Sequence, residues 1–390
     1  MSDSGDFFAD AFGFSEFQSY EQTQAMLMKR AKFEPTTTPG GFYAEKCTIG
    51  GRNNTLLNSG LAYVPSVAEL HQDVQVMLRD PTIAARLAQT QPTILLQNSV
   101  GESRSMHGDP RVDGSVVQAA SQFNLLEFPT EEHVPENGIS GYLFDRTQGP
   151  ACAIACASGT AYRNYLMPTP FGPIDQNRSR GQRRHNQINC LADVEKVIQS
   201  KSGGKSLWTT TNGYVESSIH DLTQLNQLLN VEPGLGEELK QNLRIGVQEN
   251  TQVTDVTGEW VKQSDGKFVR NTTRVNHVTQ TYNSALSIGY SRVDPEHWQP
   301  LAHIVLDASY EATLLVGIKQ TLFALKTGKR LPMTLLTKVG GGVFQNDTAW
   351  IKSAIQRAIR RVKDYKVPLD IHIVHYGQVD AEYENLAVTG

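Results

Sequence analysis

The C-terminal third of the chain alternates between short apolar runs and longer amphipathic runs. Apolar runs of the buried-strand type occupy residues 281–290, 333–336 and 369–374. Between them, apolar residues recur at helical spacing over 301–316 and 351–362. Nearly continuous apolar strands separated by helices are typical of an α/β sheet that is covered by helices on both faces. Ligands of such sheets bind beyond the carboxyl ends of the strands.

The preceding part of the chain supplies further elements of the same kind. Buried-strand runs lie at residues 92–98, 115–120 and 243–247. Residues 66–87 carry apolar positions at helical spacing, and an Asp-Pro pair at 80–81 marks a break between two helices. These runs extend the predicted sheet and its helical layers upstream.

The chain is expected to form one large domain. Its 390 residues would suffice for two or three domains of average size, but no internal repeat divides them. We interpret residues 41–390 as a single catalytic domain with an insertion at about 165–240. Residues 1–40 mix Phe with Ser, Gln and Thr, which favours a mobile or peripherally docked extension.

The composition argues against several classes of protein. Lys and Arg number 36 against 40 Asp and Glu, and the resulting net charge of -4 does not favour a nucleic-acid partner. An N-terminal signal and an apolar window of membrane-spanning length are not apparent. The four cysteines form no Cys-x-x-Cys pair and are too sparse for a disulfide framework. We therefore expect a cytoplasmic protein with reduced thiols and no membrane partner.

The most informative run joins a strand, three glycines and a helix between Leu335 and Ile351. Residues without side chains at a strand end let backbone N–H groups approach an anion, and the helix N-terminus adds the positive end of its dipole. The run lacks the Gly-Lys-Ser/Thr of a P-loop and the spacing of G-x-G-x-x-G. An ordinary glycine turn is the alternative interpretation. The candidate ligand contacts are Gly340, Gly341, Gly342, Val343, Phe344 and Asn346.

Two further segments are candidates for the same ligand. Thr147, Gln148 and Gly149 precede a helix rich in small residues, which permits close approach to a ligand or, alternatively, tight packing against a sheet. A second group follows the strand at 115–120, where amides and a hydroxyl could contact a ribose. Its members are Gln118, Ser121 and Asn124.

Several runs resemble the macrodomain family. Val116-Val-Gln-Ala-Ala-Ser is similar to the macrodomain strand that ends in Val-Asn-Ala-Ala-Asn, and Gly341-Gly-Val-Phe344 resembles the second phosphate loop. The longer runs SALSIGYS, DPEHWQPLAHIVLDASYEATL and GGGVFQNDTAWI, with NGY at 212–214 and DRTQGPACA at 145–153, are similar to divergent macrodomains. This group includes the Legionella effector MavL and its eukaryotic relatives, and the resemblance covers roughly residues 90–380.

The resemblance implies a macrodomain-like three-layer sandwich, with a mixed central sheet between helices, that binds ADP-ribose. Members of the group are ADP-ribosylhydrolases, and MavL removes ADP-ribose from arginine on ubiquitin. The implied function is removal of mono-ADP-ribose from arginine of a modified protein, with ubiquitin as the candidate, without a metal or another cofactor. Gln118 and Ser121 replace the two asparagines of the family motif, and the Gly-Gly-Gly…Gln-Glu-Glu signature of poly(ADP-ribose) glycohydrolases is absent. A reader module that binds ADP-ribose without cleaving it is the alternative.

Three acids are candidates for catalysis. Asp294 follows the run at 281–290, where a carboxylate could lie over the ligand crevice, although Asp-Pro-Glu is also a typical helix start. Asp307 and Glu311 are four residues apart and share one helix face, so they could divide acid and base work or bind a guanidinium group. A solvated helix face is the other interpretation of this pair.

Overall fold

The computed structural model describes residues 6–255, 260–262, 268–270 and 275–386. Its centre is a mixed nine-stranded sheet. In spatial order the strands are β1 (Ala31–Thr37), β2 (Tyr43–Gly50), β3 (Leu56–Tyr63), β10 (Gly246–Gln252), β13 (His277–Asn283), β5 (Val116–Ala120), β14 (Met333–Leu336), β15 (Leu369–His375) and β4 (Ile94–Val100). The first five strands pair antiparallel, and every pair from β13 to β4 is parallel.

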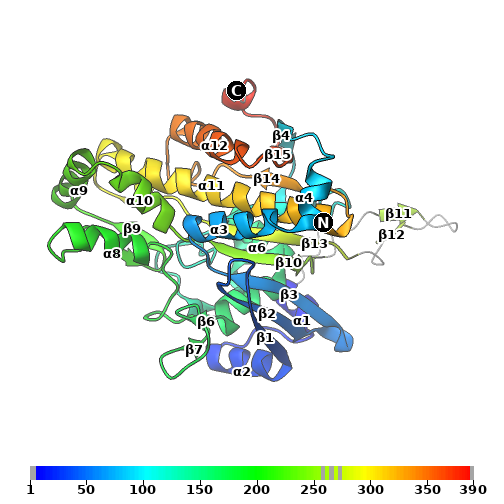
Figure 1. Ribbon diagram of the computed structural model, residues 1–390. Helices are drawn as coiled ribbons and strands as arrows, with labels where there is room; N and C mark the ends of the chain where they lie inside the picture. The colour runs from blue at the N-terminus through cyan, green and yellow to red at the C-terminus, as the bar shows by residue number, and fades with distance from the viewer. Residues whose placement is uncertain (1–5, 256–259, 263–267, 271–274, 387–390) are drawn as a thin grey trace.

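Helices cover both faces of this sheet (Figure 1). The helices are α1 (Phe7–Phe12), α2 (Tyr20–Arg30), α3 (Val67–Leu78), α4 (Pro81–Leu87), α5 (Ser103–His107), α6 (Gln148–Ala155), α7 (Ala157–Ala161), α8 (Ala192–Lys201), α9 (Ile219–Val231), α10 (Leu235–Asn242), α11 (Pro295–Thr327) and α12 (Thr348–Lys363). Helix α11 lies on one face and contacts α3, α4, α10 and α12, whereas α6 and α7 pack on the opposite face. The predicted α/β architecture, a mixed sheet between helical layers, is confirmed.

Side-chain alternation in the strands explains the two faces. Gln118 on β5 donates a hydrogen bond to Thr313 of α11, 3.2 Å away. Gln248 on β10 instead donates to the carbonyl oxygen of Gly159 in α7. Because successive strand residues point to opposite sides, each strand contributes to both helical interfaces.

The predicted strand at 281–290 ends earlier than expected. Strand β13 stops at Asn283, and a 3₁₀ helix occupies Ile288–Tyr290. The segment between them remains buried, and the backbone N–H of Gly289 donates to the carbonyl oxygen of Phe344. The strand was predicted too long because the apolar run continues into the buried segment after it. A buried loop and a buried strand have the same apolar pattern in a sequence.

Residues 6–37 belong to the folded body, in contrast to the mobile or peripheral extension expected from the sequence. Phe8 and Phe12 of α1 are fully buried, and β1 pairs with β2 along its whole length. The sequence did not predict this packing, because α1 has only six residues and too short a run of aromatic and polar positions to show helical periodicity. The domain limits at 41 and at 165–240 stay predictions.

The segment expected as an insertion builds small elements outside the central sheet. Its two-stranded pairs are β6 (Pro168–Thr169) with β7 (Ser179–Arg180) and β8 (Thr209–Thr211) with β9 (Tyr214–Glu216), and it carries α8 to α10. Another two-stranded pair, β11 (Trp260–Lys262) with β12 (Phe268–Arg270), follows β10.

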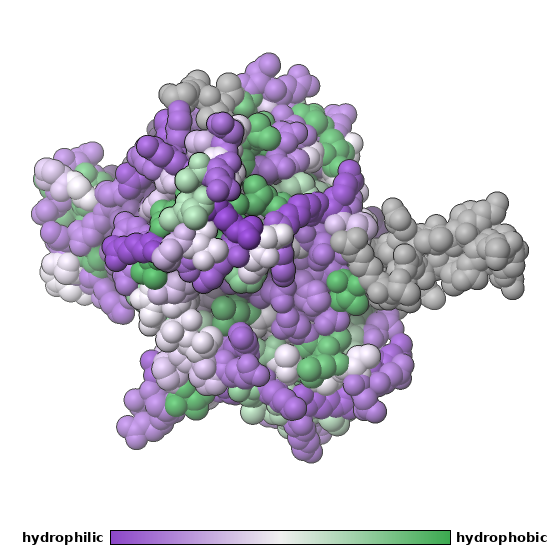
Figure 2. All heavy atoms as spheres, turned by 45° about the vertical axis from the view of Figure 1, so that its right-hand side comes forward, coloured by the Kyte–Doolittle hydropathy of each residue, from purple (hydrophilic) through white to green (hydrophobic). Residues whose placement is uncertain are grey.

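Helix α11 is long and apolar enough to cross a membrane by length and composition alone. However, 83% of its most apolar 18-residue window is buried inside the protein, as expected of a core helix. The four cysteines are also buried and free. On the face shown in Figure 2, hydrophobic side chains form separate patches among hydrophilic ones, a distribution common on globular proteins.

Candidate functional site

A cavity opens at the carboxyl ends of β5 and β14. Its volume is about 190 Å³. The lining comes from the end of β5, the loop after β14, the start of α6 and the loop at 127–129, together with Tyr214 and Tyr290. This is the edge at which α/β sheets generally bind ligands.

The loop after β14 lines the cavity and includes backbone N–H groups that have no hydrogen-bond partner among the described residues. Gly340 has a φ of +77°, and a Cβ atom there would lie 2.4 Å from the Cβ of Ala285, so both conformation and space require glycine. The N–H of Gly341 is used within the loop, where it donates to the carbonyl oxygen of Lys338. Within the described part of the chain, no hydrogen bond involves the N–H groups of Gly340, Gly342, Val343 and Phe344.

Asn346 fixes the shape of this loop from behind. Its Nδ2 donates to the carbonyl oxygen of Leu286 at 2.8 Å, and its backbone N–H donates to that of Gly340 at 2.9 Å. Asn346 is 4% exposed and does not line the cavity. It is therefore a positioning residue for the loop.

The start of α6 meets the end of β5 at unusually short range. A Cβ atom on Gly149 would lie 1.9 Å from the carbonyl oxygen of Ala120, which excludes any side chain there. The side chain of Gln148 accepts from the N–H of Ala120 and donates to the carbonyl oxygen of Gln118, both at 2.8 Å. The first-turn N–H groups of Gln148 and Gly149 have no partner within the helix and border the cavity.

Three aromatic rings form one wall of the cavity. Phe344 lies edge-on to Tyr214 and to Tyr290, with ring centroids 5.5 and 5.9 Å apart. Tyr214 and Tyr290 are themselves 5.3 Å apart. This cluster, which we call the aromatic wall, joins β9, the segment after β13 and the glycine loop, and it can hold a planar or sugar group by contact with its rings.

Two carboxylates line the cavity and differ in access. Asp145 is partly exposed, and one of its oxygens accepts from the N–H of Thr147 at 2.7 Å. Glu127 is buried against Arg163, whose Nη2 lies 2.9 Å from both carboxylate oxygens. Burial raises the pKa of Glu127 to about 7, although the adjacent guanidinium group opposes the shift. Only Asp145 of these two can reach a substrate without rearrangement of a buried ion pair.

The cavity brings together most of the residues expected to bind the ligand. Those that line it are Ser121, Thr147, Gln148, Gly149, Gly340, Gly342, Val343 and Phe344. Gln118 and Asn124 are buried and do not line it. Gln118 accepts from the N–H of Thr337, whereas Asn124 donates to Gln187 and accepts from the N–H of Leu126. Gly341 also lies outside the lining.

The three predicted catalytic acids do not line this cavity. Asp294 is exposed and occupies the N-cap position of α11, although its side chain accepts no capping hydrogen bond. Asp307 forms a bidentate ion pair with Arg357, in which Nε lies 2.8 Å from both carboxylate oxygens. Helix α11 turns Asp307 toward α12 rather than toward the glycine loop, and a catalytic role for these acids stays a prediction.

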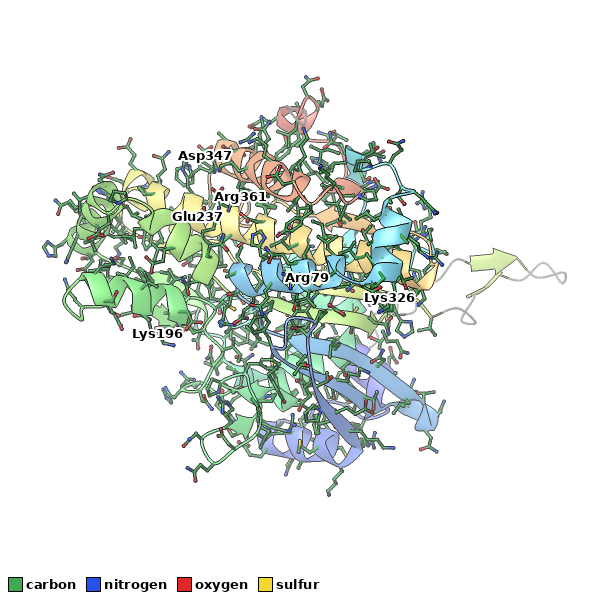
Figure 3. All side chains as sticks on the ribbon, viewed as in Figure 1. Arg79, Lys196, Glu237, Lys326, Asp347 and Arg361 are labelled. Carbon is green, nitrogen blue, oxygen red and sulfur yellow. The ribbon has the colours of Figure 1, made fainter. Side chains whose placement is uncertain are left out.

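Glu311 is held in a buried network on the same side as Asp307. Its oxygens lie 2.7 Å from Nε2 of His71 and 3.2 Å from Nζ of Lys240. Arg361 approaches at 3.6 Å and also pairs with Glu237 of α10, and Figure 3 shows these two side chains meeting between α10 and α12. Burial acts to raise the pKa of Glu311, but His71 and the nearby cations outweigh it and leave the pKa below its usual value.

No role was predicted from the sequence for Asp145, Glu127, Tyr214 and Tyr290. Asp145, Tyr214 and Tyr290 lie within runs that resemble the macrodomain family. Their positions in these runs could have indicated that they lie near the ligand. Glu127 had no such signal, because its closeness to Arg163 depends on the fold. Among the described residues, no group of three or more His, Cys, Asp or Glu side chains could hold a metal ion.

No family model matches the sequence, and no curated protein matches it. Among solved structures, the chain is similar to poly(ADP-ribose) glycohydrolase from Deinococcus radiodurans in complex with ADP-ribose, at 10% identity and a TM-score of 0.35 over 83% of this chain and 90% of that one. It is also similar to poly(ADP-ribose) glycohydrolase from Thermomonospora curvata, at 13% identity and a TM-score of 0.31 over 94% of each chain. Such values are too low to assign a ligand or an activity to this protein.

Proposed function

We propose that this chain is a divergent macrodomain-type hydrolase that binds ADP-ribose in the cavity between the glycine loop and α6. The observation that carries the proposal is that one cavity is lined both by the start of α6 and by Gly340, Gly342, Val343 and Phe344, whose N–H groups have no partner among the described residues. Backbone N–H groups at a glycine loop and a helix N-terminus suit a diphosphate.

The neighbouring groups fit the rest of ADP-ribose. With the diphosphate on the glycine loop, the aromatic wall borders one ribose or base, and Ser121 offers a hydroxyl group from the end of β5. Lys338 also lines the cavity, and the carboxylate of Asp380, 3.3 Å away, offsets its charge. The part of the ligand that joins a modified protein would extend from the cavity toward solvent.

For the reaction, we propose hydrolysis of the bond between ribose C1 and a guanidine nitrogen of arginine. The oxygen of a water molecule forms the new bond to C1 and its proton passes to Asp145. The electron pair of the broken bond stays on the guanidine nitrogen, which takes up that proton from Asp145. Arginine specificity and ubiquitin as the modified protein come from the family resemblance. A cytoplasmic location fits the four free thiols.

Binding is tested by adding a carboxylate to the glycine loop. A Cβ atom on Gly342 would meet nothing within 4 Å, so Gly342→Asp adds negative charge to the cavity without a clash. We expect ADP-ribose affinity in calorimetry to fall more than about tenfold, or 1.4 kcal/mol. Gly236→Asp in α10 is the matched control, because its Cβ would make only an ordinary contact at 3.8 Å. Equal affinity of both variants would remove the glycine loop from the site.

Hydrolysis is tested by Asp145→Asn, which keeps the oxygen that accepts from Thr147 and removes the charge. Release of ADP-ribose from an arginine-modified protein should fall by about 10² or more, with ADP-ribose affinity nearly unchanged. Substrates modified on glutamate or serine should react more slowly than the arginine conjugate with the unaltered protein. Unchanged release by the variant would exclude Asp145 as the base.

A reader module that binds without cleavage is the second candidate. The observation that favours it is that Asp294, Asp307 and Glu311 do not line the cavity. Of the two carboxylates that line it, Asp145 is the accessible one. Tight ADP-ribose binding with no release from any of the three conjugates would select this function.

A further inference from the structure

A second cavity lies at the opposite edge of the sheet from the proposed ADP-ribose site. It is bordered by Gly114, His277 and Pro332, which stand at or just before the amino ends of β5, β13 and β14. Its volume of about 500 Å³ falls in the range of small-molecule sites. The residues that line the two cavities are entirely different.

The floor of this second cavity is a buried polar network. Nζ of Lys319 on α11 donates to the hydroxyl oxygen of Tyr63 at 2.8 Å and to Asp73 at 2.5 Å. The Tyr63 hydroxyl donates in turn to Glu249 at 2.5 Å, and Lys319 lies 3.6 Å from the same carboxylate. The two carboxylates therefore offset the charge of Lys319, and the floor contributes no excess positive charge.

The excess positive charge lies on other walls. Lys46 of β2 and Lys329, just after α11, line the cavity and are exposed. Neither forms an ion pair within the residues that the structure describes. Arg330 also lines the cavity, and its guanidinium group donates to the carbonyl oxygens of Arg111 and Asp113. Glu249 is the one carboxylate among the described lining residues, so the field in the cavity favours an anion.

The remaining wall is apolar. Leu61, Met77 and Phe323 come from β3, α3 and α11, and Phe323 keeps 47% of its surface exposed. Lys329 stands beside this ring, with Nζ 5.7 Å from its centroid. An apolar surface next to unpaired ammonium groups suits a ligand that has an apolar body and an anionic head.

We propose that this second cavity is a binding site for an amphiphilic organic anion, with the anionic head toward Lys46 and Lys329 and the apolar part against Leu61, Met77 and Phe323. The site is independent of the proposed function. Its occupant differs from ADP-ribose in chemistry and enters at the other edge of the sheet, so the two ligands bind together rather than in competition.

Calorimetry on the full chain tests the site with decanoate as the probe, below its micelle concentration. Decanol and decyltrimethylammonium share the apolar chain and change only the head group. Decanoate should bind at least about tenfold more tightly than either. Equal binding of all three probes, or no binding of decanoate, would overturn the proposal.

Variants locate the binding. The double variant Lys46→Gln/Lys329→Gln should weaken decanoate at least about tenfold, and Phe323→Ala should weaken decanoate and decanol alike. Lys196→Gln on α8, labelled in Figure 3, is the charge control, because Lys196 is exposed and distant in sequence from the lining residues. Saturating ADP-ribose should leave decanoate affinity unchanged. A separate site would be contradicted if decanoate affinity fell only in the Lys196 variant, or if ADP-ribose displaced decanoate.

Discussion

Single buried charges in this protein are held by partners from distant parts of the chain. Glu311 binds His71 and Lys240, and Arg163 binds Glu127 while its guanidinium group lies 3.7 Å from the ring centroid of Tyr282. Such pairs are costly to break from one side, because the remaining charge stays buried without a partner. Glu311, which looks catalytic in the sequence, is therefore held by cations that the fold supplies.

Glu311→Gln distinguishes these roles. The pKa of Glu311 is lowered in the folded state, so the ionised carboxylate stabilises the fold above its unfolded pKa and this contribution is lost as the pH falls through the folded pKa. The variant should lose about 3–5 kcal/mol in free energy of unfolding at pH 7. The difference from the unaltered protein should shrink as the pH falls below the usual range of glutamate.

Chemical denaturation at several pH values measures this effect, with Glu238→Gln on the exposed side of α10 as the control. Hydrolysis per folded molecule should be unchanged in the Glu311 variant. A stable variant that has lost its activity would return Glu311 to a catalytic role.

At the scale of elements, the site depends on how closely α6 approaches β5. Gly149 permits the contact, and the Gln148 side chain bridges two backbone groups of β5. The glycine loop approaches the same strand end from the other side through Thr337, whose N–H donates to Gln118. The spacing of the N–H groups that border the cavity is thus set by contacts between elements.

Gly149→Ala should move the start of α6 away from Ala120, since the added methyl group cannot occupy a position 1.9 Å from a carbonyl oxygen. We expect a loss of about 1–3 kcal/mol in stability, as for other overpacked positions, and weaker ADP-ribose binding in the folded fraction. Gly236→Ala in α10 has room for the methyl group and should stabilise slightly. Normal melting temperature and affinity for Gly149→Ala would show that this contact does not set the site.

At the scale of the whole molecule, the N-terminal segment completes the fold. Strand β1 forms one edge of the sheet, and α1 buries Phe8 and Phe12 against the body of the protein. Glu16 accepts hydrogen bonds from the N–H groups of Ile139 and Ser140, far along the chain. The segment therefore stabilises the region that leads into the loop before α6.

Phe12→Ala should lower the free energy of unfolding by about 3–5 kcal/mol, the usual cost of removing a buried aromatic side chain. Phe17→Ala is the matched control, because Phe17 is 39% exposed and should cost much less. Denaturant titration of both variants measures the difference. Equal small losses would mean that the segment is only peripherally docked.

The sequence by itself determined the alternation of strands and helices, because periodic apolar patterns reflect local geometry. Strands β5, β14 and β15, the break between α3 and α4 and the glycine loop after β14 all lie where these patterns indicated. Candidate ligand contacts at Gly340, Gly342 and Gly149 could also be predicted from the sequence. Glycine at a strand end or a helix start has a conformational reason that does not depend on distant residues.

Only the tertiary structure decided which polar groups are free to act. Asp307 and Glu311 share a helix face as predicted, but Arg357, His71 and Lys240 reach that face from other elements and pair with them. Asp145 is accessible because the fold leaves it at a cavity mouth. Burial and charge pairing depend on contacts between residues far apart in sequence, and a local sequence pattern does not predict these contacts.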